Sequence, residues 1–179
     1  MRVIAGEFRS RRLVSLPGLD TRPTPDRLRE TLFNILSPVI EGSVFVDAYA
    51  GTGSVGIEAI SRGARLAIFI EKDRDAVEVI KANLASLDIK AKGRIIKGAA
   101  SLHLASVEAD IVFIDPPYPK DTEYRNALDV ISVKPPGLTV VQHSVRYKIP
   151  DQYESLVRTR TVKQGDNALS FFKASEAAG

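Results

Sequence analysis

The chain has no cysteine and no long apolar segment, and each absence removes a class of protein. None of its 179 residues is cysteine, so disulfide bonds and thiolate chemistry are excluded, which fits a reducing compartment. No apolar run approaches the roughly 18 residues that a membrane helix requires, and the N-terminus lacks an apolar signal core. The sequence therefore predicts a soluble, cytoplasmic protein without membrane contact.

Histidine is scarce, which bears on metal binding. The two histidines, His103 and His143, stand alone, and no group of histidines or cysteines has metal-ligand spacing. We interpret both as packing or surface residues. The sequence therefore predicts no metal site.

The excess of positive charge lies in the first 30 residues. This segment holds seven of the 25 basic residues and four of the 22 acidic ones, which leaves 18 of each in the remainder and assigns the net charge of +3 to one end. All seven are arginines, whose planar fork suits phosphate contact and base stacking. This cluster of arginines favours the binding of a polyanion over the alternative that the arginines only form a solvent-exposed surface. Arg22 and Arg29 have an alternative role, in which each would bind the appendage to the main domain instead of contacting a polyanion.

Hydrophobic periodicity predicts an N-terminal appendage followed by an alternating α/β domain. In residues 1–40 it predicts a hairpin of strands 1–6 and 12–16 and a helix from residue 26 that ends at 37–38. Beyond residue 40, strands are predicted at 44–48, 66–71, 94–97, 111–114, 138–142, 156–163 and 168–172. Helices are predicted at 54–62, 73–87, 101–107 and 123–131, and residues 175–179 are predicted to be a frayed tail.

Alternating helices and continuously apolar strands are typical of a parallel sheet covered on both faces. The last two strands are close enough in sequence to form an antiparallel hairpin. We therefore expect a doubly wound, mostly parallel, seven-stranded Rossmann-like sheet over residues 41–174, with that hairpin at its C-terminal edge. Ligands of such sheets bind beyond the carboxyl ends of the strands.

A glycine-rich turn follows the strand at 44–48. Gly51, Gly53 and Gly56 form a G-x-G-x-x-G pattern, and Glu71 ends the next strand, where an acid would bind ribose hydroxyls. The pattern indicates a nucleoside cofactor, although a tight turn with positive φ also explains glycine. Asp47 precedes the turn and would repel a pyrophosphate, whereas the cationic S-adenosylmethionine makes this acid favourable. We therefore prefer S-adenosylmethionine to NAD.

The tetrapeptide Asp115-Pro116-Pro117-Tyr118 follows the apolar strand at 111–114. The prolines fix φ and cannot continue a ladder, so the backbone leaves the sheet along a set path. A carboxylate, free carbonyls and an aromatic ring would then hold the amino edge of a flat, nitrogen-rich ring. The alternative is a loop terminator with a surface tyrosine.

These motifs resemble the class I S-adenosylmethionine-dependent amino-methyltransferases with a DPPY motif. Segments 2–6, 21–36 and 164–172 narrow the resemblance to the bacterial 16S rRNA (guanine-N2)-methyltransferase family that modifies guanine 966. The resemblance spans nearly the whole chain. It implies an enzyme acting on 16S rRNA, naked or in a small-subunit ribonucleoprotein particle, and we expect a monomer.

The resemblance and the motifs together define three sets of site residues. The catalytic set is Asp115, Pro116, Pro117 and Tyr118. The cofactor-binding set is Asp47, Tyr49, Ala50, Gly51, Thr52, Gly53, Gly56, Glu71, Lys72, Ala99 and Ala100. The RNA-binding set, within the appendage at 1–40, is Arg2, Arg9, Arg11, Arg12, Arg22 and Arg27.

One departure from the family pattern concerns the cofactor's adenine. Many such enzymes carry an acid after the third strand, but residues 98–101 here are Gly-Ala-Ala-Ser. Adenine recognition would then rest on backbone groups or Ser101.

For the reaction, we expect Asp115 to keep its ordinary pKa of about 3.9 and to act as a hydrogen-bond acceptor while the methyl group is transferred. The target guanine must be exposed or flipped out to reach it. Three alternatives remain: a DNA N6-adenine or N4-cytosine methyltransferase, an NAD-dependent oxidoreductase, and a non-catalytic RNA-binding module.

Overall fold

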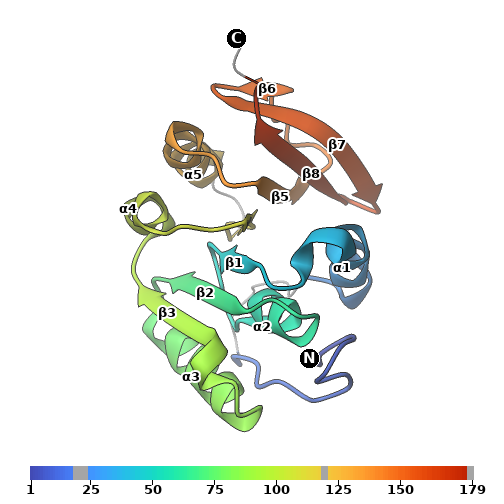
Figure 1. Ribbon diagram of the computed structural model, residues 1–179, viewed down its shortest axis with the longest axis vertical. Helices are drawn as coiled ribbons and strands as arrows, with labels where there is room; N and C mark the ends of the chain where they lie inside the picture. The colour runs from blue at the N-terminus through green and yellow to red at the C-terminus, as the bar shows by residue number, and fades with distance from the viewer. Residues whose placement is uncertain (18–23, 118–120, 177–179) are drawn as a thin grey trace.

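A mixed sheet with helices on both faces forms the centre of the structure (Figure 1). The computed structural model describes residues 1–17, 24–117 and 121–176. Its strands are β1 (Val44–Asp47), β2 (Leu66–Glu71), β3 (Gly93–Lys97), β4 (Ile111–Ile114), β5 (Leu138–Ser144), β6 (Gln152–Tyr153), β7 (Leu156–Gln164) and β8 (Asn167–Ala174). Its helices are α1 (Asp26–Ile40), α2 (Ser54–Ser61), α3 (Arg74–Ser86), α4 (Ala100–His103) and α5 (Asp121–Val133), with 3-10 turns η1 (Lys90–Lys92) and η2 (Leu104–Ser106).

The strand order is β3-β2-β1-β4-β5-β8-β7-β6. The pairs from β3 through β5 are parallel, and those from β5 through β6 are antiparallel. This confirms the predicted fold class with its C-terminal hairpin. The strand number of seven is wrong, because the two-residue strand β6 adds an eighth strand to the described sheet. So short a strand leaves no periodic signal in the sequence.

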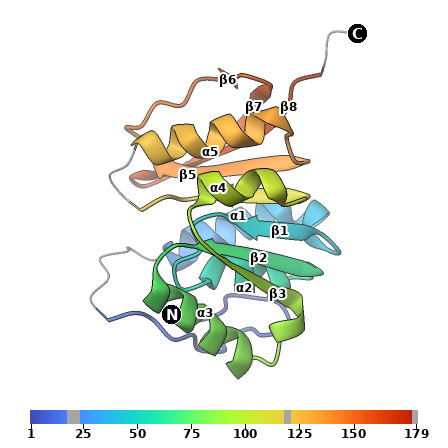
Figure 2. The ribbon, with the colours of Figure 1, turned by 90° about the vertical axis from the view of Figure 1, so that its left-hand side faces the viewer.

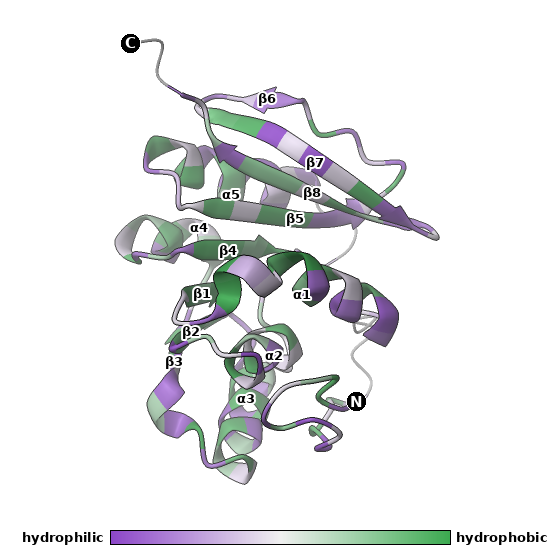
Figure 3. Cartoon of the chain, turned by 45° about the vertical axis from the view of Figure 1, so that its right-hand side comes forward, coloured by the Kyte–Doolittle hydropathy of each residue, from purple (hydrophilic) through white to green (hydrophobic). Residues whose placement is uncertain are grey.

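The central strands are buried on both faces, as their continuous apolar sequences predict. Alternate residues enter two clusters: Phe45 and Phe113 pack with α1 and α2, whereas Val46 and Val112 pack with α5. Figure 2 shows α4 and α5 on one face and α1 and α2 on the other. In Figure 3, β4 is hydrophobic while β7 alternates along its length, because the outer face of β7 is exposed. No helix of the described residues has the length and apolarity to span a membrane.

Two predicted elements of the first 40 residues differ from the structure. The helix continues past the predicted end to Ile40 with Pro38 inside it, and Ile40 is buried with the other apolar side chains of α1. The two predicted hairpin strands are reduced to a single bridge between Arg2 and Arg12.

The backbone of residues 1–17 is held by the hydrogen bonds around the Arg2–Arg12 bridge and by side chains of α2 and α3. Glu58 accepts hydrogen bonds from the amides of Ile4 (2.8 Å) and Ala5 (3.0 Å). Asn83 accepts from the Val14 amide (2.7 Å) and donates to the Val14 carbonyl (3.2 Å). Val3 and Arg11, and Leu13 and Met1, still pair through backbone hydrogen bonds, but the helices bind the amides of Ile4, Ala5 and Val14. The pairing therefore stays short, and the segment follows the surface of α2 and α3.

Arg29 connects α1 to this N-terminal segment. Its side chain is fully buried and donates to the Arg2 carbonyl (2.6 Å) and to Asp26 (3.2 Å), and its Nε lies 3.9 Å from Glu58. Burial lowers the pKa of Arg29, and the charges of Glu58 and Asp26 oppose that shift. Arg29 therefore has the internal role that the sequence left open, whereas Arg22 lies outside the described residues.

Replacing the buried Glu58 should destabilise the protein. Glu58→Gln removes the charge that faces Arg29 and Arg62, so we expect a loss of about 3–5 kcal/mol in the free energy of unfolding, the usual cost of breaking a buried ion pair. Denaturant unfolding measures it. Glu78→Gln, which removes an exposed partner of Lys81, is the matched control and should leave the midpoint unchanged. Equal midpoints for all three proteins would contradict this role of Glu58.

Candidate cofactor and catalytic site

Three acids meet at the carboxyl edge of the sheet. Asp47 ends β1, Glu71 ends β2, and Asp115 directly follows β4. In the parallel register, Asp47 pairs with Phe69 of β2 and with Phe113 of β4, so Glu71 and Asp115 each lie two positions beyond Asp47 on a neighbouring strand. The edge where ligands of such sheets bind is therefore strongly acidic.

The glycine-rich turn leads from β1 into α2 over this edge. Gly51 and Gly53 have φ values of +56° and +82°, which favour glycine. Gly56 has another role: a Cβ there would lie 2.3 Å from Cε1 of Phe69, so its absence lets α2 approach β2. The Ala50 amide donates to the Ile70 carbonyl (3.0 Å), which fixes the turn on the neighbouring strand.

Asp47 is buried below this turn and is 1% exposed. Its Oδ2 accepts a hydrogen bond from the Gly56 amide at 3.1 Å. Burial raises the pKa of Asp47 to about 7, the Gly56 hydrogen bond opposes the shift, and the charges of Asp115 and Glu71 add to it. Among the described residues no cationic side chain contributes to the shift, so a bound cation would relieve it.

The other predicted cofactor residues are brought together only in part. Glu71 accepts from the amides of Gly51 (2.7 Å) and Asp73 (2.8 Å), so it braces the turn and the start of α3. Tyr49 points away toward α5, where its hydroxyl contacts Glu123 (3.2 Å).

The remaining predicted cofactor residues differ in exposure. Lys72 is exposed and Ala99 is partly buried. Ala100 packs in the core, so only its backbone faces the edge. The hydroxyl of Thr52 lies 3.6 Å from Sδ of Met1.

Asp115 differs from the expectation of an ordinary acid. Its side chain is mostly buried, and burial raises its pKa to about 7, so the expected value of about 3.9 is wrong for this structure. Oδ2 of Asp115 accepts from the hydroxyl of Thr24 at 3.4 Å, which partly opposes the shift. Pro116 is buried and Pro117 is exposed, while Tyr118 lies outside the described residues.

Thr24 is a site residue that the sequence did not assign. It is 7% exposed and reaches Asp115 from 91 positions earlier in the chain. Its only sequence signal was its place between Pro23 and Pro25. Thr24 brings the segment that precedes α1 to the end of β4.

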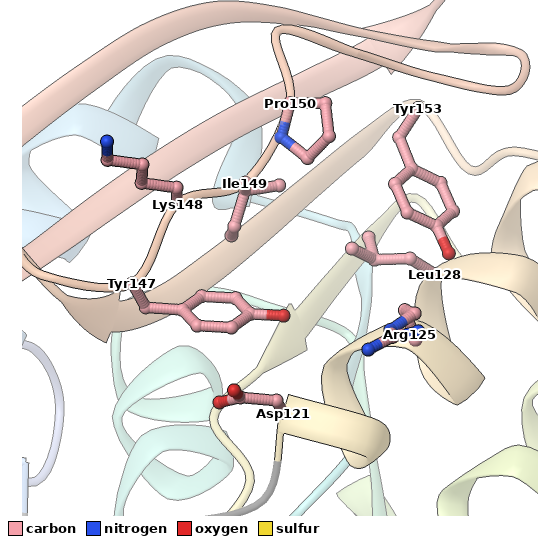
Figure 4. A pocket seen from close by; sticks show the side chains of 8 residues that line it. All are labelled: Asp121, Arg125, Leu128, Tyr147, Lys148, Ile149, Pro150 and Tyr153. Carbon is pink, nitrogen blue, oxygen red and sulfur yellow. The ribbon is translucent and has the colours of Figure 1, made fainter.

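A pocket of about 260 Å³ lies on the opposite face of the sheet, between α5 and the loop after β5 (Figure 4). Asp121, Arg125, Tyr147 and Lys148 are among its lining residues. Tyr147 stacks on Tyr124 with ring centroids 4.6 Å apart, and the charge of Asp115 contributes to the raised pKa of Tyr124. The described lining of this pocket includes no residue of the glycine turn. Tyr124, which stacks on the lining residue Tyr147, is close enough to Asp115 to feel its charge.

The structure describes five arginines of the predicted RNA-binding set. All five are exposed, and two of them make contacts within the protein. Arg2 lies 3.6 Å from Asp26, and Arg11 donates to the Ser86 carbonyl at 3.0 Å. The exposed members of the set are Arg2, Arg9, Arg11, Arg12 and Arg27.

The histidines and other potential metal ligands were also located. His143 is buried, and its Nδ1 donates to the Ser144 carbonyl (2.8 Å) while its Nε2 accepts from the Ser170 hydroxyl (2.8 Å). It is thus a packing residue, as expected. Within the described ranges, no three or more His, Cys, Asp or Glu side chains form a group that could hold a metal ion.

Comparison with known proteins identifies the family. The model of the family described as "Conserved hypothetical protein 95" matches residues 1–173. The chain belongs to this family. It is 32% identical over 182 residues to the Bacillus subtilis protein named "Putative rRNA methyltransferase YlbH", covering 97% of this chain and 98% of that protein.

Two further similarities agree with this assignment. The Escherichia coli K12 protein named "Ribosomal RNA small subunit methyltransferase D" is 43% identical over 122 residues, which cover 66% of this chain and 60% of that protein. The solved structure titled "Putative methyltransferase yhhF from Escherichia coli" superimposes with a TM-score of 0.84 at 31% identity, covering 98% of each chain. The predicted Rossmann-like methyltransferase fold and the prediction of a methyltransferase are confirmed, and a donor of the S-adenosylmethionine type follows in general terms.

The buried acids should make the stability of the ligand-free protein depend on pH. The folded-state pKa values of Asp47 and Asp115 are raised from 3.8 to about 7, so the stability from their protonation is lost as pH rises through about 7. Asp47→Asn and Asp115→Asn remove this loss. We expect both variants to melt higher than the wild type at pH 8, with a smaller difference at pH 5, by about 2–4 °C per kcal/mol.

Thermal unfolding at the two pH values measures this effect. Asp75→Asn, at an exposed position of α3, is the control and should give no gain that depends on pH. A gain of equal size at pH 5 and pH 8 would contradict the assignment of the effect to ionisation.

Proposed function

We propose that this protein transfers a methyl group from S-adenosylmethionine to the exocyclic N2 of a guanine in 16S rRNA, the guanine 966 class. The observation that carries the proposal is the pairing of two buried acids, Asp47 under the glycine turn and Asp115 after the neighbouring strand. Asp47 suits a cationic methyl donor, and Asp115 suits the amino group that receives the methyl group. The names of the rRNA methyltransferase relatives support the substrate.

The acidic edge favours S-adenosylmethionine over a dinucleotide. S-adenosylmethionine supplies a methyl group on a sulfonium centre, carries an ammonium and has no phosphate. We place the ammonium near Asp47, whose burial without a cation raises its pKa, and the ribose hydroxyls at Glu71 beside the Gly51 amide. A pyrophosphate at this turn would meet Asp47, Glu71 and Asp115 together, and their repulsion would oppose its binding.

Asp115 and the Pro116 carbonyl would accept the two hydrogens of the guanine amino group. This orients the nitrogen lone pair toward the incoming methyl group. With a pKa of about 7, Asp115 is partly ionised at neutral pH and can take a proton once the nitrogen becomes cationic. Charge-assisted hydrogen bonds contribute roughly 1.5–3 kcal/mol, whereas fixing the reactants contributes about 7–11 kcal/mol. Orientation is therefore the larger effect.

Nucleoside mass spectrometry with primer extension on small-subunit RNA tests the proposal. RNA from a strain that lacks the gene should lack one N2-methylguanosine, and purified protein with S-adenosylmethionine should restore it, on naked RNA or on the assembled particle. Appearance of N6-methyladenosine or N4-methylcytosine in DNA would favour the DNA methyltransferase alternative. No change in any nucleoside would overturn the proposal.

The substitution Asp115→Asn should impair methyl transfer while leaving the binding of the methyl donor nearly unchanged. Asparagine keeps the size of the side chain but loses the negative charge and the proton acceptor. We expect donor affinity in calorimetry to change less than threefold and methyl transfer to fall about 100-fold or more, the range for a removed acid–base group. Asp47→Asn is the matched variant and should weaken donor binding first. A parallel loss of both properties in Asp115→Asn would assign it a structural role instead.

The exposed arginines of the N-terminal segment are proposed to contact RNA phosphates. The proposal includes Arg2, Arg9, Arg11, Arg12 and Arg27, and Arg22 beyond the described residues. Glu58 holds the backbone at Ile4 and Asn83 holds it at Val14, so Arg9, Arg11 and Arg12 lie on a fixed segment between these two points. We further propose that the protein acts as a monomer in the cytoplasm.

Charge reversal tests this RNA-binding surface. Changing Arg9, Arg11 and Arg12 together to glutamate removes three positive charges, so RNA binding should weaken and the slope of log K against log salt should flatten by about 2–3. Fluorescence anisotropy at several salt concentrations measures both quantities. The same reversal at Arg65, Arg74 and Arg94, outside this segment, is the control. An unchanged slope would remove residues 9–12 from the interface.

A further inference from the structure

Gln142 of β5 holds a buried acceptor without a donor. Its side chain is 7% exposed, and its Oε1 has no hydrogen-bond partner among the described residues. Its backbone carbonyl accepts from the Tyr124 hydroxyl at 2.9 Å, so the strand is fixed at this point. Buried polar side-chain atoms are normally satisfied, which makes this oxygen a candidate for a ligand contact.

The register places Gln142 beside Asp115. β4 and β5 are parallel with Ile114 opposite Val141, so the next residue of each strand is Asp115 and Gln142. Side chains alternate along a strand, and Phe113 and Val140 share the cluster under α1. Two residues further on, Asp115 and Gln142 therefore face the same side.

Within the described part of the chain, the neighbours of Gln142 do not supply the missing donor. Its partner on β8 is Leu169, which is fully buried and apolar. Thr139 also has an unpaired oxygen, but it lies three residues earlier, inside the sheet. The arginine nitrogens without partners belong to Arg29 and Arg62 in the Glu58 network. Among these groups, Gln142 is the one at the carboxyl edge.

We propose that Oε1 of Gln142 accepts the N1–H of the target guanine. This inference rests on the proposed function, in which Asp115 and Pro116 take the hydrogens of the 2-amino group. N1–H lies next to that amino group on the same edge of guanine, and Gln142 lies next to Asp115 on the neighbouring strand. Adenine has an unprotonated N1, which would face the Gln142 oxygen with a lone pair. Gln142 therefore selects guanine.

The test compares guanine with 2-aminopurine at the target position. 2-Aminopurine keeps the 2-amino group but has no hydrogen on N1. The substrates are small-subunit RNAs ligated from a synthetic fragment that carries either base, used naked and after assembly with the subunit proteins. The readout is the ratio of kcat/KM for the two bases, which does not depend on the folded fraction of the enzyme.

The wild type should prefer guanine by about tenfold to 100-fold, the effect of leaving a buried acceptor unpaired. Gln142→Leu removes the acceptor, so its ratio should fall by about tenfold or more. In its ionised form, the side chain introduced by Gln142→Glu accepts but cannot donate, so the ratio of this variant should rise above that of the wild type as pH increases. Thr139→Val, which removes the other unpaired oxygen of β5, is the matched control and should keep the wild-type ratio.

The outcomes separate this inference from the proposed function. If the wild type methylates guanine N2 and all four proteins share one ratio, Gln142 does not contact N1–H and the inference is overturned. A ratio that changes equally in Thr139→Val and Gln142→Leu also overturns it, because the effect would then come from the strand. If the wild type transfers no methyl group to guanine in either form of the RNA, the proposed function fails and the inference fails with it.

Discussion

The burial of uncompensated acids at one edge of the sheet is the constraint on which the site depends. In the part of the chain that the structure describes, Asp47 has one hydrogen bond, from the Gly56 amide, and no cationic partner, and burial raises its pKa to about 7. Asp115 has a raised pKa for the same reason. Such an arrangement costs stability in the free protein. In the function we propose, a cation near one acid and an amino group near the other would offset this cost.

A second buried acid, Glu58, lies away from the site and has partners for its charge. Glu58 is also a fully buried acid, but Arg62 contacts it at 2.9 Å and the amides of Ile4 and Ala5 donate to it. Its charge is satisfied within the protein and serves to hold the N-terminal segment on α2. Glu58 therefore has a structural role, whereas the described residues offer Asp47 no cationic partner, which supports its proposed role in donor binding.

The elements that the sequence predicted correctly are those encoded by patterns of neighbouring residues. The apolar runs at β1, β2 and β4 and the glycines of the turn are local signals, and the structure has those elements at nearly the expected bounds. The predicted N-terminal strands are reduced to one bridge with flanking backbone hydrogen bonds, because Glu58 and Asn83, more than 50 positions away, bind the backbone at Ile4 and Val14. The pKa of Asp115 and the unpaired oxygen of Gln142 were equally invisible, because each depends on burial and strand register. Thr24 was present in a recognised segment, but its contact with Asp115 arises only on folding.

The hydrogen bond from Thr24 links two parts of the proposed function. Thr24 lies two positions before the start of α1, and Arg29 of this helix binds the arginine-bearing N-terminal segment. Its hydroxyl donates to Asp115 and favours the ionised carboxylate against the effect of burial. Any movement of residue 24 relative to β4 therefore changes the proton affinity of Asp115. Since the proposed RNA contacts are anchored to the same helix, a bound RNA that shifts the start of α1 would also alter the charge of the acid that accepts the amino group.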